Sequence, residues 1–459
     1  MEHHSKFLSA MRTHFESGAT RQFAVRRKAL LALRTAIKKH EEALLTAMHA
    51  DMCKPRFEAY LGDIGLVYAE LDHTLKNLKD WMHPERLSTP LSLQVASSAM
   101  HTEPLGVVLI IAPWNYPVQL VLTPLIGAIA AGNCAVVKPS NEAPATAVVI
   151  ETILTEAFAK EHVLVVQGPG RDVGPKLIEP FRFDHIFFTG SPRVGRLIMA
   201  LAAPHLTPVT LELGGKSPAI VDHTADVDRA AQRIVWSRFF NAGQTCIATD
   251  HVLVHTDVKE PFLKAVAKYI ERFYGTDPKT SPHFARLVND NRFGSVSAFL
   301  NDGTILIGGE NDANERYIAP TVLTDVPLDA PVMQEEIFGP VLPVISWTTR
   351  EEVLGIVARN PYPLATYVFS SDRKAQRFFT ERIAFGGGCI NHCLLQFGNP
   401  DMTFGGVGNS GMGRYHGKAT FDLFSHHKGI VLASTMIDPG VQYPPYSSWK
   451  ERILRFVLR

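Results

Sequence analysis

The sequence is poor in cysteine and balanced in charge, and both features limit what the protein can be. Its 459 residues include five cysteines, an odd number scattered along the chain, which favours reduced thiols in the cytoplasm over a disulfide framework. The 46 basic and 45 acidic residues leave a net charge of +1, so no overall field attracts nucleic acid or an anionic membrane. We therefore expect a cytoplasmic protein that does not bind nucleic acid.

The chain also lacks a secretion signal and an unbroken apolar run. Its start, MEHHSKFLSAMRTHFESG, has no basic segment followed by an apolar run and a cleavage site. Residues 105–137 are uncharged, but Pro113, Pro117 and Pro124 interrupt them, whereas a membrane helix needs about 20 apolar residues. We expect no transmembrane anchor. The basic, amphipathic segment WKERILRFVLR is expected to dock on protein, with weak membrane-surface contact as the alternative.

The order of apolar patterns predicts an α/β protein of two or three domains. Residues 5–84 repeat apolar positions at helical spacing, and short β-branched segments such as 106–111 and 134–139 predict buried strands. Their alternation with helices predicts a parallel sheet covered on both faces, and a second alternating region spans residues 216–424. Residues 91–102 and the tail after Gly429 fit neither sheet and predict arms that contact a partner subunit or another domain.

Three residues in separate motifs suit chemistry on a carbonyl carbon. Cys246 lies in the turn NAGQTCIA, and Glu212 precedes a Gly-Gly turn in LELGGKSP; a thiol nucleophile and a carboxylate base can form and hydrolyse a thioester. Asn115 in PWNYP offers an amide donor to an oxyanion, worth about 3 kcal/mol. Taken singly, each also fits a structural role: a core cysteine, a solvated strand end, and an asparagine that satisfies its own turn.

Two strand-turn-helix segments suit the binding of phosphate. Lys138 in KPSNEAP follows a strand and precedes a helix whose N-terminus favours anions. FTGSPRVG places Gly190, Ser191 and Gly195 at a similar junction, where glycine lets the backbone approach a pyrophosphate. Neither segment has the GxGxxG spacing, so each alone is weak evidence. For Lys138 the alternative is an exposed lysine at a strand end.

No metal site is expected. Cys389, His392 and Cys393 lie close together in GGGCINHC, but no second ligand pair follows at zinc spacing and no HExxH occurs. The four cysteines other than Cys246 are therefore expected to be structural.

Taken together, the motifs resemble the aldehyde dehydrogenase superfamily over almost the entire chain. They appear in that family's order: PWNYP, KPS, FTGS, LELGGKSP, FFNAGQTC, EEIFGP and FGGVGNSG. The short N-terminus, YHG after Gly413, FSHHK and YPPYSS are most similar to the class 3 branch. The resemblance implies the α/β aldehyde dehydrogenase fold, usually as a homodimer. Its expected parts are a Rossmann-like dinucleotide-binding domain (1–84 and 103–212), an α/β catalytic domain (213–425) and a small β oligomerisation arm (85–102 and 426–459).

The resemblance also implies a mechanism: oxidation of medium- or long-chain aliphatic or aromatic aldehydes to carboxylic acids with NAD or NADP. Cys246 would form a thiohemiacetal and then a thioester, favoured if the site and the nicotinamide lower its pKa. Asn115 and the Cys246 N–H would hold the oxyanion, and Glu212 would activate water. The implied cofactor ligands are Lys138, Trp114, Gly190, Ser191, Gly195, Leu213, Glu336 and Phe338. The implied aldehyde-tunnel residues are Tyr116, Trp236 and Thr245, and Asn391 resembles a brace of the active-site loop.

One departure from the family pattern concerns the cofactor. Asn141 stands where many members place a glutamate that binds the adenosine ribose, and Glu142 is shifted by one position. We expect NADP to be accepted or favoured, unless Glu142 takes over the missing role. Two other functions stay open: a CoA-acylating relative, against which Glu212 argues, and a non-catalytic scaffold, against which the presence of all three reactive groups argues.

Overall fold

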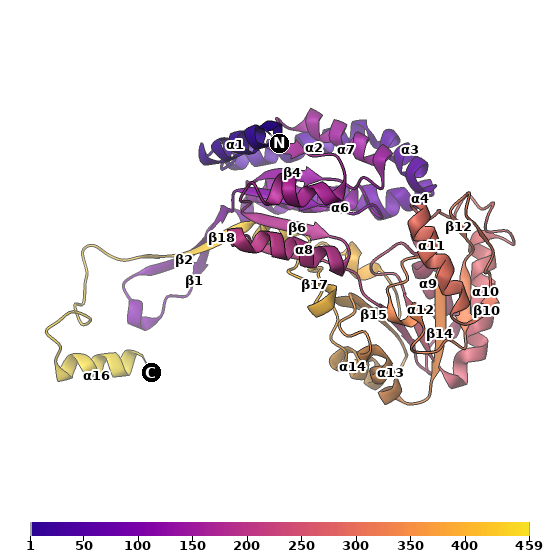
Figure 1. The fold of residues 1–459 in the computed structure, drawn as a ribbon. Coiled ribbons are helices and arrows are strands. Elements are labelled where there is room, and N and C mark those ends of the chain that lie inside the picture. Colours follow the sequence, from indigo (N-terminus) through magenta and orange to yellow (C-terminus); the bar gives the residue numbers. More distant parts are fainter. Residues whose placement is uncertain (1, 459) are drawn as a thin grey trace.

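The computed structural model describes residues 2–458, and two largely parallel sheets form its body (Figure 1). The first sheet has the strand order β17-β7-β6-β3-β4-β5, and only the pairing of β17 with β7 is antiparallel. Its strands are β3 (Val107–Ile111), β4 (Cys134–Lys138), β5 (Val163–Val165), β6 (His185–Thr189), β7 (Val209–Glu212) and β17 (Gly411–Met412).

Helices cover both faces of this first sheet, as predicted. Side chains alternate along β3, so Val108 and Ile110 join one apolar core while Val107 and Leu109 join another. The first core is built with α2 (Phe23–Lys39), α3 (Glu41–Met52), α5 (Gly65–Trp81), α6 (Gln119–Ala131) and α7 (Pro144–Ala157). The second is built with α1 (Glu2–Glu16) and α8 (Pro192–Ala202). Between α3 and α5 lie α4 (Arg56–Ala59) and one π-helical turn, η1 (Tyr60–Ile64).

The second sheet has the order β10-β13-β14-β9-β8-β15-β16, with β10 antiparallel to β13. Its strands are β8 (Pro218–Val221), β9 (His251–His255), β10 (Thr304–Ile307), β13 (Thr321–Thr324), β14 (Val341–Trp347), β15 (Ala365–Phe369) and β16 (Gly387–Ile390). The helices in this half are α9 (Val227–Phe239), α10 (Lys259–Tyr274), α11 (Asp290–Ala298), α12 (Pro331–Gln334), α13 (Arg350–Ala358) and α14 (Arg373–Arg382). A short hairpin pairs β11 (Asn311–Asp312) with β12 (Tyr317–Ile318), and α15 (Lys418–Leu423) leads back to the first half.

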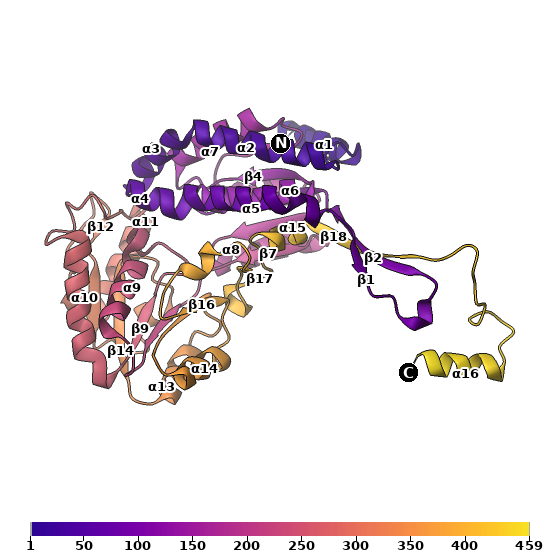
Figure 2. The ribbon, with the colours of Figure 1, turned by 180° about the vertical axis from the view of Figure 1, so that it is seen from behind.

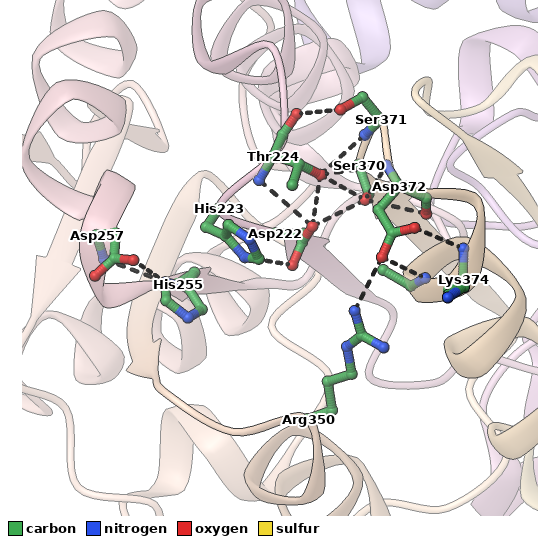
Figure 3. Close-up of polar contacts among 11 residues, drawn as sticks. Asp222, His223, Thr224, His255, Asp257, Arg350, Ser370, Ser371, Asp372 and Lys374 are labelled. Atoms are coloured by element: carbon green, nitrogen blue, oxygen red, sulfur yellow. Dashed lines mark hydrogen bonds and ion pairs between the residues drawn. The ribbon is translucent and has the colours of Figure 1, made fainter.

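At the carboxyl end of the second sheet, hydrogen bonds tie neighbouring strands together (Figure 3). Asp222, which follows β8, accepts at Oδ2 from the hydroxyls of Thr224 (2.7 Å) and Ser370 (2.9 Å). Asn391, which follows β16, accepts from Ser370 N (2.9 Å) and donates to Ser370 O (3.0 Å). Asn391 therefore braces the ends of β15 and β16. Its predicted support of the loop that carries Cys246 stays a prediction.

A three-stranded antiparallel arm projects from one end of the body, with α16 (Ser448–Val457) beyond it (Figures 1 and 2). The arm has the order β1 (Glu85–Leu87), β2 (Ser97–Pro104) and β18 (Ser425–Leu432), and β18 pairs with the full length of β2. Apolar side chains of the arm and of α16 are exposed, among them Leu432, Met436 and Phe456. The homodimer and the domain limits stay predictions, and light scattering of the full chain would test the dimer.

No helix among residues 2–458 is long and apolar enough to cross a bilayer. The uncharged stretch 105–137 forms β3, a turn, α6 and the start of β4, in agreement with the predicted strand, turn and helix. Pro113 and Pro117 lie in the turn, but Pro124 lies inside α6 and does not interrupt it as predicted.

Candidate active site

The loop that carries Asn115 meets the loop that carries Cys246 between the two sheets. Asn115 follows β3, and its Nδ2 donates to the Gln244 carbonyl at 3.0 Å. The next residue, Tyr116, makes a 2.5 Å hydroxyl–hydroxyl hydrogen bond to Thr245. Residues about 130 positions apart thus lie side by side, which brings the predicted amide donor and the predicted thiol into one site.

The Cys246 loop is held in an unusual backbone conformation. After α9 ends, Asn241 (φ 53°) and Ala242 (φ 50°) both adopt left-handed φ values, which cost roughly 1 kcal/mol or more each outside glycine. Hydrogen bonds compensate: Asn241 Nδ2 donates to Asn115 O (2.9 Å) and Gln244 O (3.2 Å). The Gln244 side chain in turn donates to the Asn241 carbonyl (3.1 Å). The motif NAGQTC therefore encodes a rigid turn that presents Cys246.

Cys246 opens onto a cavity of about 190 Å³ with an almost entirely apolar lining. Glu212, the predicted base, and Leu213, a predicted cofactor ligand, both line this cavity. The sequence also predicted three lining residues, Tyr116, Trp236 and Thr245, as parts of an aldehyde tunnel. It missed other residues that also line the cavity: Gln119, Phe240, Leu394, Phe397, Phe404 and Tyr415. Three of them belong to family motifs found in the sequence: Phe240 to FFNAGQTC, Phe404 to FGGVGNSG and Tyr415 to YHG. Membership of these motifs could have identified them as residues of the site. An apolar cavity with aromatic walls of this kind suits an apolar ligand.

Glu212 is the last residue of β7 and faces the same cavity. It is only 3% exposed, and neither carboxyl oxygen has a hydrogen-bond partner among residues 2–458. Burial therefore raises the pKa of Glu212 well above its usual range. A buried carboxyl group without a donor partner is free to exchange a proton with a molecule that enters the cavity.

The electrostatic environment of Cys246 differs from the expected one. Burial, followed by the nearby carboxyl groups of Glu336 and Glu212, raises the pKa of the half-buried Cys246 thiol. The protein alone therefore disfavours the thiolate, because desolvation and negative neighbours both oppose a second anion. Hydrogen bonds from the backbone N–H groups of Cys246 and Ile247 lower this pKa, but by less than burial and the two carboxyl groups raise it.

The predicted nucleotide ligands gather at the carboxyl edge of the first sheet, where open α/β sheets bind ligands. Lys138 ends β4; it is buried, and its Nζ donates to Pro139 O at 2.7 Å. Burial lowers the pKa of Lys138. Ser191 caps α8, accepting from Val194 N (3.5 Å), with Gly190 just before the helix and Gly195 in its first turn. A buried cation and a helix N-terminus at one edge fit a dinucleotide pyrophosphate and ribose.

Three further predicted cofactor ligands lie between this sheet edge and the Cys246 loop, and we call them the boundary residues: Trp114, Glu336 and Phe338. The rings of Trp114 and Phe338 meet edge to face, with centroids 5.5 Å apart. Burial, and then the charge of Asp250, raises the pKa of Glu336 to about 8. Gly214 makes room for it, since a Cβ there would lie 1.9 Å from Glu336 Oε2. The carboxyl group and the aromatic pair suit a ribose and a flat ring, so the residues present fit a nicotinamide nucleotide.

Glu142 does not point freely toward the ribose position. Its Oε1 accepts from Asn141 Nδ2 (2.9 Å), and its Oε2 accepts from Asn289 Nδ2 (2.7 Å). Asn289 also caps α11. Both carboxyl oxygens are therefore occupied by amides, one of them from the other half of the molecule.

The cysteines other than Cys246 do not combine into a metal site. Cys389 Sγ donates to Gln396 Oε1 (3.0 Å), and Cys393 Sγ lies 3.6 Å from Thr249 Oγ1. Within residues 2–458, no three metal-ligating side chains are grouped closely enough to hold an ion.

A thiol and a carboxyl group that line one apolar cavity, beside a sheet edge that could hold a nucleotide, fit an NAD(P)-dependent oxidoreductase. The chain belongs to the aldehyde dehydrogenase family, whose sequence profile matches residues 2–430. The predicted family, fold and enzyme class are thereby confirmed.

The chain is similar to class 3 aldehyde dehydrogenases over nearly its whole length. It is 44% identical to mouse aldehyde dehydrogenase family 3 member B2, over 98% of this chain and 94% of the relative. The solved structure titled as the substrate-bound state of Staphylococcus aureus AldH superposes with a TM-score of 0.97 at 41% identity, covering 99% of both chains.

More distant solved structures differ in the cofactor that their titles name. An Escherichia coli NADP dependent enzyme is 25% identical with a TM-score of 0.85, over 93% of this chain and 89% of its own. The NAD-dependent aldehyde dehydrogenase from Sinorhizobium meliloti is 28% identical with a TM-score of 0.86, over 95% and 88%. Proteins similar to this chain thus use NAD or NADP.

Proposed function

We propose that the protein oxidises medium- or long-chain aliphatic or aromatic aldehydes to carboxylic acids in the cytoplasm. The observation that carries this proposal is the apolar cavity of about 190 Å³, into which Cys246 and Glu212 open beside the Asn115 loop. The almost wholly apolar lining favours apolar aldehydes, because a polar substrate tail would lose its hydration there without gaining partners.

The proposed reaction begins at Cys246. The thiol transfers its proton to a water molecule, and Sγ adds to the aldehyde carbon to give a thiohemiacetal whose oxygen carries negative charge. The Asn115 amide and the backbone N–H of Cys246 stabilise that oxygen, an effect worth about 3 kcal/mol for one such donor. A nicotinamide nucleotide, when bound, would supply the hydride acceptor, and Lys138, Ser191 and the boundary residues (Trp114, Glu336 and Phe338) would hold it. Oxidation of the thiohemiacetal carbon would leave a thioester on Cys246.

Glu212 completes the proposed cycle. Its ionised carboxylate takes a proton from a water molecule, and the resulting hydroxide adds to the thioester carbon. The C–S bond then breaks, the carboxylic acid leaves, and the Cys246 sulfur is regenerated. The buried carboxyl group of Glu212, with both oxygens free of partners among the described residues, supports its assignment as the base.

A panel of aldehydes tests the proposed substrate class. We expect kcat/KM to rise from acetaldehyde to decanal and to be high for benzaldehyde and cinnamaldehyde, because each buried CH₂ adds about 0.8 kcal/mol of transfer free energy. The measurement is reduced-cofactor absorbance at 340 nm. A flat or falling series would contradict the apolar assignment, and turnover that starts only when CoA is added would indicate an acyl-CoA product instead.

We further propose that NADP is accepted, because Asn141 places no carboxylate at the ribose and Glu142 is held by two amides. We expect kcat/KM for NAD and NADP to differ by less than about a hundredfold, which corresponds to nearly 3 kcal/mol. Asn141→Glu should lower kcat/KM for NADP about tenfold or more, because like charges repel a 2′-phosphate. Strong NAD preference in the wild type would refute the proposal, and Glu142→Gln would then show whether the Glu142 carboxylate sets that preference.

A further inference from the structure

Residues 54–63, which we call the bracket, lie against both loops of the site. The bracket runs from Lys54 through α4 into the π-helical turn η1, where Asp63 lies. Lys54 and Asp63 have no exposed surface, and Glu58 is 8% exposed. The proposed reaction uses none of these three charged side chains, so their burial calls for another role.

Lys54 binds the loop that carries Asn115. Its Nζ donates to Asp63 Oδ2 (2.7 Å) and to the main-chain oxygen of Asn115 (3.1 Å). The same ammonium lies 4.0 Å from the centroid of the Tyr116 ring, a cation–π contact. One buried cation therefore fixes the backbone of the proposed oxyanion donor and the ring of its neighbour.

Asp63 holds the far end of the same loop. Its Oδ1 accepts from the backbone N–H groups of Val118 and Gln119, each at 3.1 Å. These groups begin α6, whose first N–H groups have no partner within the helix. The ion pair of Lys54 and Asp63 thus spans the whole turn from Asn115 to the start of α6.

Glu58 holds the loop that carries Cys246. Its Oε2 accepts from Asn241 N at 2.8 Å, and Asn241 Nδ2 donates to the Asn115 carbonyl at 2.9 Å. The Asn115 carbonyl therefore accepts from Lys54 on one side and from Asn241 on the other. The hydrogen bonds of Glu58, Asn241, Asn115 and Lys54 connect the bracket to both loops.

Gly62 brings the bracket into contact with both loops at once. A Cβ on Gly62 would lie 2.8 Å from Tyr116 Cε1 and 3.2 Å from Phe240 Cε1. These rings come from the Asn115 loop and from the end of α9, so a shift of the bracket would move both walls of the site.

We propose that the bracket is a positioning element that sets the Asn115 amide relative to Cys246, so that the oxyanion forms within reach of its donors. The proposal rests on the proposed function and adds a role for Lys54, Glu58 and Asp63. A buried ion pair often contributes little more stability than apolar side chains of equal volume. The ion pair of Lys54 and Asp63 does fix the positions of the backbone groups it binds. An oxyanion donor acts only when it is held at the right position relative to the reacting carbon.

Two reactions of Cys246 separate positioning from general damage. With 4-nitrophenyl acetate, Sγ adds to the ester carbonyl through an oxyanion, the C–O bond breaks and 4-nitrophenolate leaves. With iodoacetamide, Sγ displaces iodide from a saturated carbon and no oxyanion forms. A change that moves only the oxyanion donor slows the first reaction, whereas a change that disorders the Cys246 loop alters both.

The test measures both rates in the full chain for Glu58→Ala, Glu58→Gln and the double variant Lys54→Met/Asp63→Asn. The double variant leaves no lone buried charge. We expect acylation to fall about tenfold to a hundredfold in the double variant, with alkylation within about threefold of the wild type, because Lys54 and Asp63 bind only the Asn115 loop. Glu58→Ala also removes the acceptor of Asn241 N in the Cys246 loop, so both rates are expected to fall in this variant, acylation by a larger factor than alkylation. Glu58→Gln keeps an oxygen acceptor for Asn241 N and is expected to retain most of the acylation rate.

Arg56→Ala is the matched control, because Arg56 lies on the same helix but forms an exposed ion pair with Glu42. Its two rates should equal those of the wild type. Parallel loss of acylation and alkylation, or no loss of either, would overturn the positioning role. If the double variant does not fold, the comparison of Glu58→Ala with Glu58→Gln decides. Wild-type protein that is acylated but oxidises no aldehyde would refute the proposed function and leave this role intact.

Discussion

Replacing Cys246 with alanine is expected to lower aldehyde turnover by on the order of 10⁴-fold or more, because no other group can form the covalent adduct. The cavity offers no substitute: the other polar groups that line it, such as Glu212, Thr245 and Tyr415, are far poorer nucleophiles than a thiol. The decisive measurement is cofactor reduction at 340 nm with decanal or benzaldehyde, at saturating NAD or NADP.

The Cys246→Ala substitution should abolish aldehyde turnover without weakening nucleotide binding. Nucleotide binding, followed by fluorescence of the reduced cofactor, should change little in Cys246→Ala, because Cys246 is not among the proposed nucleotide ligands. Cys53→Ser is the control, since Cys53 is also a free thiol but exposed and outside the site. Residual turnover above about one per cent of the wild type would show that hydride transfer does not need the thiol adduct.

The sequence was most informative where function depends on a short continuous segment. The turn NAGQTC contains both its hydrogen-bonding side chains, Asn241 and Gln244, and the residue it presents, Cys246, so its motif predicts its geometry. The alternation of β-branched and helical segments likewise predicted the two sheets, because central strands such as β3 and β4 are buried on both faces and form apolar runs in the sequence.

Contacts between distant segments were not predictable in the same way. Lys54 and Asp63 read as ordinary charged positions of a surface helix, and only the fold places Lys54 Nζ beside a carbonyl that is 61 residues away. Glu142 gives a similar case. Its partner Asn289 lies 147 positions along the chain, so the sequence left open whether its carboxylate reaches the ribose. A single sequence shows charge and spacing but does not show which long-range partner satisfies a buried group.

Replacing Glu212 with glutamine is expected to separate the two halves of the reaction. The amide cannot accept a proton from water, so hydrolysis of the thioester should slow by about 10²- to 10⁴-fold, while formation of the thioester needs only Cys246, the oxyanion donors and the cofactor. Rapid mixing should therefore show a burst close to one reduced cofactor per subunit, followed by slow turnover. The variant is nearly isosteric, so the cavity keeps its shape.

The pH dependence provides the control for this assignment. Burial raises the pKa of Glu212, so the fraction of ionised base, and with it the hydrolysis rate of the wild type, should increase as pH rises through that pKa. In Glu212→Gln this dependence should disappear from the slow phase, because the titrating group is gone. A burst that keeps the wild-type pH profile, or steady turnover without a burst, would mean that a different group activates water. Tyr415 is the next group to test, since it is buried and lines the same cavity.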